Sequence, residues 1–594
     1  MALSQLPADG ATVALVWQRL EIVLAAENSY ASPYADVVVW VDLQGPDFSK
    51  RVYGFWDGGD IFRVRLTATR PGQWRWVSGS SGPDTGLNGK SGHFTAVPQG
   101  AESIEANPNL RGMIGITPDK RGLQYADGTP FFLIGDTWWA LPTYKFPLPR
   151  GDGHHDIGPD ADLRDYLELR KRQGFNSVAL LAAAPAWATD GKPSDLYDAE
   201  GTLLRAAWKS PGTSSPMNMH NEGGRPFQFP GKVPGFEDEV PDYDQINPAY
   251  FRVLDDKMEI IADLGFVPFL EVARRDTGPA WRKYHDWPTS YVRYIQYVFS
   301  RYQAHNAIFS PIHYDYYLKT IPAHAYNEPS NAVIERFGRP PFGTLLSANA
   351  NPSTLANFGD NGHWLDLHQT GNTREHYSYW WMSEIFGASP TKPALAGEPY
   401  YSGLYDLATP YTLGKPGDTP EDDMYVRSGM YGSLLSGGYA GYIYGAEGIW
   451  QSAVEPGSRV FMWDAFKWSS GETVRHLRTF AFVHGTDYRR LVPCSDALTG
   501  GRNAPEMAYE GWAYAAGAPD RSWFLLYFEG NCADVLRLRG FSEPERFRPT
   551  WFDPRSGEWQ QPADTLTVSV DATLHLPDRP DTRDWGLLLE RTKD

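Results

Sequence analysis

The chain of 594 residues has little cysteine and no excess of positive charge. Its only cysteines are Cys494 and Cys532, so disulfide bonds do not hold the fold together, and the sequence leaves open whether these two pair. The 54 Lys and Arg residues are outnumbered by 72 Asp and Glu, which gives a net charge of −18. Such a charge repels phosphate backbones and anionic lipid surfaces, so we expect neither a nucleic acid nor a membrane as partner.

Long apolar runs and cofactor motifs are also missing. No stretch approaches the ~20 apolar residues that span a bilayer, and the first residues lack the basic and apolar regions of a signal peptide. We therefore expect a soluble cytoplasmic protein, or a periplasmic or secreted one if a signal peptide has been removed. Zinc-protease, serine-elbow and dinucleotide-binding motifs are absent, so we expect no metal and no cofactor. Homo-oligomerisation is left open.

Aromatic residues, in contrast, are abundant. Trp 22, Tyr 33 and Phe 29 together make up 14% of the chain. Many of these rings must fill hydrophobic cores. A surplus of this kind also suits platforms that stack on the faces of sugars.

The rhythm of apolar residues changes twice along the chain. Residues 12–97 alternate with period two between Gly-rich turns, which predicts an antiparallel β-sandwich. From residue 121 apolar strands alternate with amphipathic helices, which predicts a (β/α)8 TIM barrel. Short strands return after residue 506 and predict a second β-sandwich. The expected domains are 1–105, 106–493 and 494–594, in a chain whose length suits roughly three or four domains.

Eight apolar segments are candidates for the barrel strands. Two of them end in an acid with aromatic neighbours: Asp315 ends the fourth, and Glu398 ends the seventh beside Tyr401. The carboxyl ends of barrel strands converge on one face, so we expect these two carboxylates to meet there. Glycosidic bonds are broken by such a pair, one acid at the leaving oxygen and one carboxylate near the anomeric carbon. The eight segments are Phe131–Asp136, Gly174–Leu181, Phe266–Glu271, Ala307–Asp315, Thr344–Ala348, Trp364–His368, Pro393–Glu398 and Tyr439–Tyr444.

Several ordered motifs over residues 121–493 resemble the apiosidase-like barrel family, which includes glycoside hydrolase family 140. The motifs are Phe131–Trp139, His305–Phe309, Lys392–Pro399 and Tyr444–Trp450. The first segment resembles the sandwich that precedes many bacterial glycoside hydrolase barrels, and the last resembles the small β-domain that closes them. The resemblance implies Asp315 as acid/base and Glu398 as nucleophile, or the reverse. Two motifs depart from the family pattern, at His313-Tyr-Asp315 and at Gly441-Tyr-Ile-Tyr-Gly445, so the family's best-known substrate is not implied.

Further residues are candidates for substrate binding. Asp136 ends the first strand beside Trp138 and Trp139, where it either binds a sugar hydroxyl or is a structural acid of the core. Glu271 ends the third strand and either binds substrate, pairs with Arg274 or competes as a third catalytic acid. The other candidates are the rings of Tyr401, Tyr444 and Trp450 and the histidines His313 and His368. Either histidine could hydrogen-bond a sugar hydroxyl, tune the pKa of Glu398, or be a buried, satisfied histidine.

The function predicted from these observations is an exo-acting glycoside hydrolase. It would release a terminal sugar, with a furanose as one candidate, from a plant or microbial oligosaccharide, and we expect retention of the anomeric configuration. The exo preference rests on the long insertion at residues 190–241, which could block one end of a cleft. The alternatives are an apiosidase proper and a carbohydrate-binding barrel that has lost catalysis.

Overall fold

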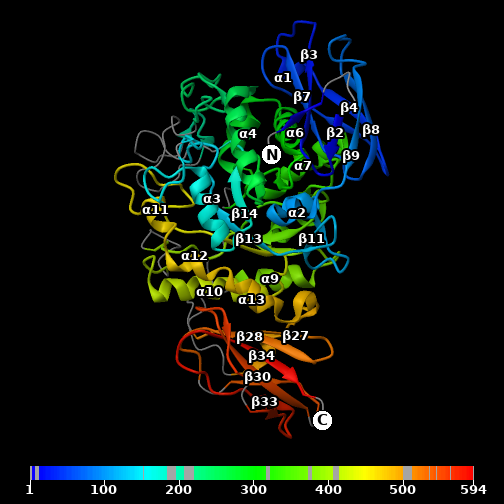
Figure 1. The fold of residues 1–594 in the computed structure, drawn as a ribbon. Helices are drawn as coiled ribbons and strands as arrows, with labels where there is room; N and C mark the ends of the chain where they lie inside the picture. The colour runs from blue at the N-terminus through cyan, green and yellow to red at the C-terminus, as the bar shows by residue number, and fades with distance from the viewer. Residues whose placement is uncertain are drawn as a thin grey trace.

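The computed structural model describes residues 3–6, 12–151, 153–183, 196–205, 220–315, 321–371, 378–405, 414–499, 511–533, 536–542, 545–561 and 564–592. The chain runs from an N-terminal β part, through a central α/β part, to a C-terminal β part (Figure 1). None of the described helices is long and apolar enough to cross a membrane. The two cysteines are not bonded to each other.

The N-terminal part consists of two sheets around a common core. One has four strands in the order β1-β3-β7-β6 and the other has five in the order β2-β9-β8-β4-β5. In β8, Trp74 and Trp76 are buried and Arg75 between them is exposed, which is the expected period of a half-buried strand. The strands are β1 (Ser4–Gln5), β2 (Thr12–Leu15), β3 (Leu20–Ala25), β4 (Val39–Gly45), β5 (Phe48–Tyr53), β6 (Phe55–Trp56), β7 (Ile61–Leu66), β8 (Gly72–Ser80) and β9 (Ser91–Val97).

The central part contains an eight-stranded parallel sheet with the strand sequence of a (β/α)8 barrel. All eight predicted segments contribute a strand, and the order in the sheet is β21-β20-β19-β14-β13-β24-β23-β22. The segment that leads into the edge strand β22 lies beside the other edge strand, β21, where the N–H of Asp366 donates to the carbonyl of Leu346 at 2.8 Å. The strands are β13 (Leu133–Thr137), β14 (Ser177–Leu181), β19 (Val267–Glu271), β20 (Ile308–Ser310), β21 (Leu345–Leu346), β22 (His368–Thr370), β23 (Ala394–Ala396) and β24 (Gly441–Tyr444).

Alternate residues of these strands divide between two cores. Leu133, Phe269 and Leu395 belong to the cluster inside the barrel. Their neighbours Ile134, Leu270 and Ala396 pack against the surrounding helices. A side chain's place in this alternation therefore decides whether it points into the barrel or toward the helices behind the sheet.

The helices follow the strands as the sequence predicts. The side chain of Asp162 caps α3 (Leu163–Arg172) in a reciprocal capping box with Asp165. Asn247 caps α4 (Pro248–Asp263), whose first residue is proline. The other helices of eight residues or more are α6 (Thr289–Tyr302), α7 (Asn327–Phe337), α9 (Ser378–Gly387) and α10 (Pro420–Leu435).

The predicted insertion at residues 190–241 lies partly outside the described residues, which omit 184–195 and 206–219. Its described portion includes the hairpin of β15 (Leu196–Tyr197) and β16 (Leu203–Arg205). Asp198 in this hairpin accepts hydrogen bonds from Lys283 and from Tyr284 of α5 (Gly278–Tyr284). The hairpin is thus fastened beside the loop that follows β19.

Buried ion pairs fasten the N-terminal sheets to the barrel helices. Asp255 of α4 binds Arg65 of β7 at 2.5 Å and Arg301 of α6 at 2.6 Å. Arg301 also binds Asp57 of the N-terminal part at 2.9 Å. Because both arginines are at most 3% exposed, these pairs are shielded from solvent.

The C-terminal part packs on α10 and α13 (His476–Ala481). Arg427 of α10 binds Asp584 at 2.7 Å, and Tyr431 stacks on Tyr527 with ring centroids 4.7 Å apart. A seven-stranded and a three-stranded sheet form this part. The main strands are β25 (Val492–Pro493), β27 (Ala513–Gly517), β28 (Trp523–Phe528), β30 (Arg546–Asp553), β31 (Glu558–Trp559) and β34 (Trp585–Arg591), with β26 (Leu498–Thr499), β29 (Arg537–Arg539) and β33 (Thr573–His575) in the smaller sheet.

Candidate active site

Two acids far apart in the sequence meet at the carboxyl ends of the barrel strands. Asp315, Glu398 and His313 each place one side-chain atom within 4.8 Å of the other two. Glu398 lies two residues past β23 and Asp315 lies five past β20. After β20 the chain continues alongside its neighbours, since His313 pairs with Arg274 and Tyr314 pairs with Ala350 in isolated bridges. This extension carries Asp315 to the level of Glu398.

Asp315 is surrounded by positive charge. Its carboxylate binds Arg274 at 2.8 Å and also binds Arg275, and His313 lies 3.4 Å away. Burial alone would favour the neutral acid. The two guanidinium groups and His313 outweigh burial and hold the pKa of Asp315 well below its ordinary value. Asp315 is therefore ionised at neutral pH in this arrangement.

Glu271 connects the surroundings of both acids. This last residue of β19 is fully buried, and one of its oxygens binds the Nδ1 of His313. Its other oxygen accepts the backbone N–H of Asn349 at 3.0 Å, and the Asn349 side chain donates to Glu398 at 2.9 Å. Burial opposes the charged form of His313, but the carboxylates of Glu271 and Asp315 raise its pKa to about 9. Of the alternatives for Glu271, the structure shows an ion pair, and the partner in that pair is His313.

Three of the predicted rings line the interior of the barrel at this level. Trp139, Tyr401 and Trp450 belong to the inner core cluster. The ring of Trp139 contacts that of His313 edge-on, with centroids 4.4 Å apart. The hydroxyl of Tyr401 donates to Thr137 Oγ1 at 3.1 Å. These rings lie on the same side of the strands as the two acids and remain candidates for contact with a sugar.

Two of the predicted substrate-binding residues lie at the end of the first strand but on its outer side. Asp136 is fully buried and binds Arg170 of α3 at 2.7 Å, and it accepts the indole N–H of Trp138 at 2.8 Å. Trp138 in turn stacks on Phe146 in the helix-facing core. The alternation along β13 turns both side chains away from the barrel interior. The structural alternative for Asp136 fits this placement, and a hydroxyl-binding role for Asp136 or Trp138 does not.

Tyr444 and His368 also face the helices. The hydroxyl of Tyr444 lies 2.8 Å from Ser470 Oγ, and its ring contacts the Arg170 guanidinium. His368 begins β22 instead of ending it, so it lies at the opposite end of the strand from the acids. Its Nδ1 is 2.8 Å from Thr354 Oγ1, and burial lowers its pKa to about 4. Direct contact with substrate, predicted for both residues, does not fit this geometry.

Sequence reasoning missed Asn349 and the arrangement of the arginines. Asn349 follows the predicted fifth strand by one residue, and a polar residue in that position was the available signal. Gly371 is necessary for its placement, because a Cβ at this glycine would lie 1.9 Å from Asn349 Oδ1 and 2.8 Å from the Ala350 nitrogen. Arg275 carries no comparable signal, since a pair of arginines in a loop is more often solvated than buried on an acid.

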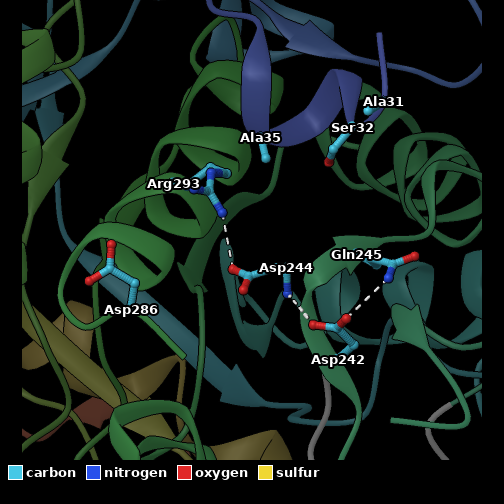
Figure 2. Close-up of a pocket in the computed structure, with 8 residues that line it drawn as sticks. All are labelled: Ala31, Ser32, Ala35, Asp242, Asp244, Gln245, Asp286 and Arg293. Carbon is cyan, nitrogen blue, oxygen red and sulfur yellow. Dashed lines mark hydrogen bonds and ion pairs between the residues drawn. The ribbon is translucent and has the colours of Figure 1, made fainter. Parts of the chain in front are cut away.

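A separate cavity of about 360 Å³ lies between α1 (Pro33–Asp36), β18 (Asp242–Ile246) and α6 (Figure 2). Two of its three acids are paired with cations: Asp244 binds Arg293 at 3.0 Å, and Asp242 binds Lys232 at 3.1 Å. Its lining, all of it within the described part of the chain, contains no aromatic ring. The cavity therefore offers neither a free carboxylate pair nor a stacking platform, and we place the candidate active site at Asp315 and Glu398.

An eight-stranded parallel barrel with two facing acids at its strand ends is the architecture of a barrel glycoside hydrolase. Residues 117–482 match the family model described as Apiosidase-like, catalytic domain, and the chain belongs to this family. Residues 14–81 match a domain of unknown function, DUF5060. No curated protein sequence matches the chain significantly.

Solved structures agree with the family in fold. A candidate glycoside hydrolase from Bacteroides vulgatus aligns with a TM-score of 0.64 at 17% identity, over 98% of this chain and 100% of its own. A glycoside hydrolase aligns with a TM-score of 0.55 at 16% identity, over 82% and 99%. A family 5 glycoside hydrolase from Bacteroides vulgatus gives 0.54 at 16% identity, over 82% and 94%. At these identities the likeness concerns the fold.

Proposed function

We propose that the chain hydrolyses glycosidic bonds with Asp315 and Glu398 as the reacting carboxylates. The observation that carries the proposal is that the two side chains approach within 4.8 Å in a buried setting lined by rings. Retaining glycosidases hold their carboxyl groups about 5–5.5 Å apart, whereas inverting ones leave about 6.5–9.5 Å for a water. The short separation supports retention through a covalent glycosyl-enzyme.

The surroundings of Asp315 affect which of the two carboxylates acts as acid/base and which as nucleophile. In the assignment that the resemblance implies, Asp315 protonates the leaving oxygen and Glu398 attacks the anomeric carbon. Asp315 must then hold a proton, which its pairing with Arg274 and Arg275 opposes. Donation by Asp315 requires that the bound substrate separates its carboxylate from at least one guanidinium group. The reverse assignment, with ionised Asp315 as nucleophile, needs no such separation and is favoured by this observation.

The substrate we propose is an oligosaccharide from which one terminal sugar is released, with a furanose as the first candidate. The hairpin of β15 and β16 supports exo action, because it follows β14 at the end of the strands where barrel active sites lie and is fastened there through Asp198. The two motifs that depart from the family pattern support a sugar other than that of the best-known family members.

A panel of 4-nitrophenyl furanosides and pyranosides tests the activity. We expect hydrolysis of at least one, with loss of about 10³-fold or more in kcat for Asp315→Asn and for Glu398→Gln. Asp286→Asn, an acid at the separate cavity, is the matched control and should keep full activity. Binding of oligosaccharide without release of reducing ends would instead identify a non-catalytic barrel.

Azide distinguishes the two roles. When the nucleophile is replaced by alanine, azide attacks the anomeric carbon directly and gives a glycosyl azide of inverted configuration. When the acid/base is replaced, azide attacks the covalent intermediate and the configuration is retained. Proton NMR of the products from the Asp315→Ala and Glu398→Ala variants therefore assigns each acid.

A further inference from the structure

The loop that carries Glu398 is hydrogen-bonded to a buried acid, Asp422, outside the candidate active site. Residues 398–403 follow β23, and the side chains of Tyr400 and Ser402 turn toward Asp422 in the first turn of α10. We propose that Asp422 is a positioning residue, which fixes this loop and through it the carboxylate of Glu398. The inference rests on the proposed function insofar as Glu398 is one of the reacting groups.

Asp422 receives three hydrogen bonds from this short segment. Its Oδ1 accepts the Tyr400 hydroxyl at 2.6 Å and the backbone N–H of Gly403 at 2.8 Å. Its Oδ2 accepts the Ser402 hydroxyl at 2.5 Å. Since Asp422 is fully buried, water cannot replace these bonds when the carboxylate is removed.

The same segment is bound on its other side to the barrel. The N–H of Ser402 donates to the carbonyl of Gly445 at 2.9 Å, and the N–H of Glu447 donates to the carbonyl of Ser402 at 2.8 Å. Tyr401 lies between the two Asp422-bound side chains and contributes its ring to the inner wall. A shift of the loop would therefore move the ring of Tyr401 and the carboxylate of Glu398 together.

The burial and the hydrogen bonds of Asp422 fit a role in holding the loop. No cation in the described part of the chain forms an ion pair with Asp422, and burial raises its pKa to about 7 in spite of the hydrogen bonds from Gly403, Ser402 and Tyr400. An asparagine can keep the geometry, because its oxygen accepts from Tyr400 and Gly403 and its amide donates to Ser402. An alanine removes all three bonds. The two substitutions therefore separate hydrogen bonding from charge.

The test compares Asp422→Ala, Asp422→Asn and the control Asp423→Ala. Asp423 is the next residue of α10 and bonds to Ser469 instead of the loop. We measure kcat and KM on the 4-nitrophenyl glycoside that the unaltered chain hydrolyses fastest, together with hydrogen exchange of the amides of residues 400–403. For Asp422→Ala we expect kcat to fall about 10- to 100-fold, KM to change less than about twofold, and exchange to accelerate. Asp422→Asn and Asp423→Ala should resemble the unaltered chain.

Each outcome decides the proposal. An alanine variant with unchanged kcat and unchanged exchange overturns it, and so does an equal loss in the Asp423→Ala control. If no glycoside is hydrolysed by the unaltered chain, the proposed function fails while the exchange measurement still decides whether Asp422 holds the loop. If the alanine variant does not fold, Tyr400→Phe and Ser402→Ala each remove one of the three bonds and should show the same effects to a smaller degree.

Discussion

Replacing Asp315 should destabilise the chain as well as inactivate it. Its carboxylate lies between two guanidinium groups, Arg274 and Arg275, which are 2% and 5% exposed. Removing one member of a buried ion pair costs about 3–5 kcal/mol, because the remaining charge stays buried without its partner. In Asp315→Asn the amide oxygen still accepts one bond, and Asp276 remains 3.2 Å from Arg274. We therefore expect the lower end, about 3 kcal/mol.

The matched comparison is Glu398→Gln. Glutamine keeps the size of the side chain and still accepts the hydrogen bond from Asn349, so its cost should stay below about 1 kcal/mol. For a large domain, about 3 kcal/mol corresponds to a fall of roughly 5 °C in the melting temperature. Calorimetry of the unaltered chain and the two variants measures both values. Both variants should lack hydrolytic activity, so that only their stabilities differ.

The dependence on pH provides an internal check. The folded chain lowers the pKa of Asp315, so the stability that this pairing contributes is complete above the ordinary pKa of about 4 and is lost only in stronger acid. The difference in stability between the unaltered chain and Asp315→Asn should thus be constant from about pH 5 to pH 6, below the interval in which His313 titrates. A variant that melts within 1 °C of the unaltered chain across this range would refute the reasoning, since the buried pairing could not then have the assumed strength.

Two further predictions concern stability. The pKa of His313 is raised to about 9 from 6.5, so the stability that its pairing contributes is complete below about pH 6.5 and is lost as the pH rises through 9. The melting temperature of the unaltered chain should therefore fall over this interval, and that of His313→Gln should fall less. Parallel curves for the two proteins would contradict the pairing. Asp255→Ala leaves Arg65 and Arg301 buried without their shared acid and should cost about 3–5 kcal/mol by chemical denaturation, whereas Asp42→Ala, from an exposed pair, should cost below about 1 kcal/mol. Equal costs for Asp255→Ala and Asp42→Ala would show that burial of the junction is unimportant.

The sequence predicted the elements well because period and burial determine them locally. Each of the eight predicted segments shares residues with a strand of the barrel sheet, and Asp315 and Glu398 lie together, as expected of the ends of the fourth and seventh predicted strands. The sixth strand was placed too early. Trp364 is buried and donates a hydrogen bond to Asn327, but it lies before the strand, and β22 begins only at His368.

The roles of individual side chains were harder to predict because they depend on the face of the strand. Asp136 and Tyr444 stand near strand ends, where functional residues gather, but one step of alternation places them behind the sheet. Their partners Arg170 and Ser470 come from helices 34 and 26 residues further along the chain. Contacts of this kind follow from tertiary packing, which the local pattern does not encode.

The junction around Asp255 has a consequence for how the protein can be divided. A fragment that begins after the N-terminal sheets would keep Asp255 and Arg301 on its helices but would lose Arg65 and Asp57. It would also uncover the aromatic surface where Phe55 meets Tyr297. Such a truncated barrel should aggregate more readily than the complete chain, because a newly exposed apolar patch beside an incomplete charge network promotes association. The N-terminal sheets are therefore part of the packed structure of the enzyme, unlike a separate module joined to it by a flexible linker.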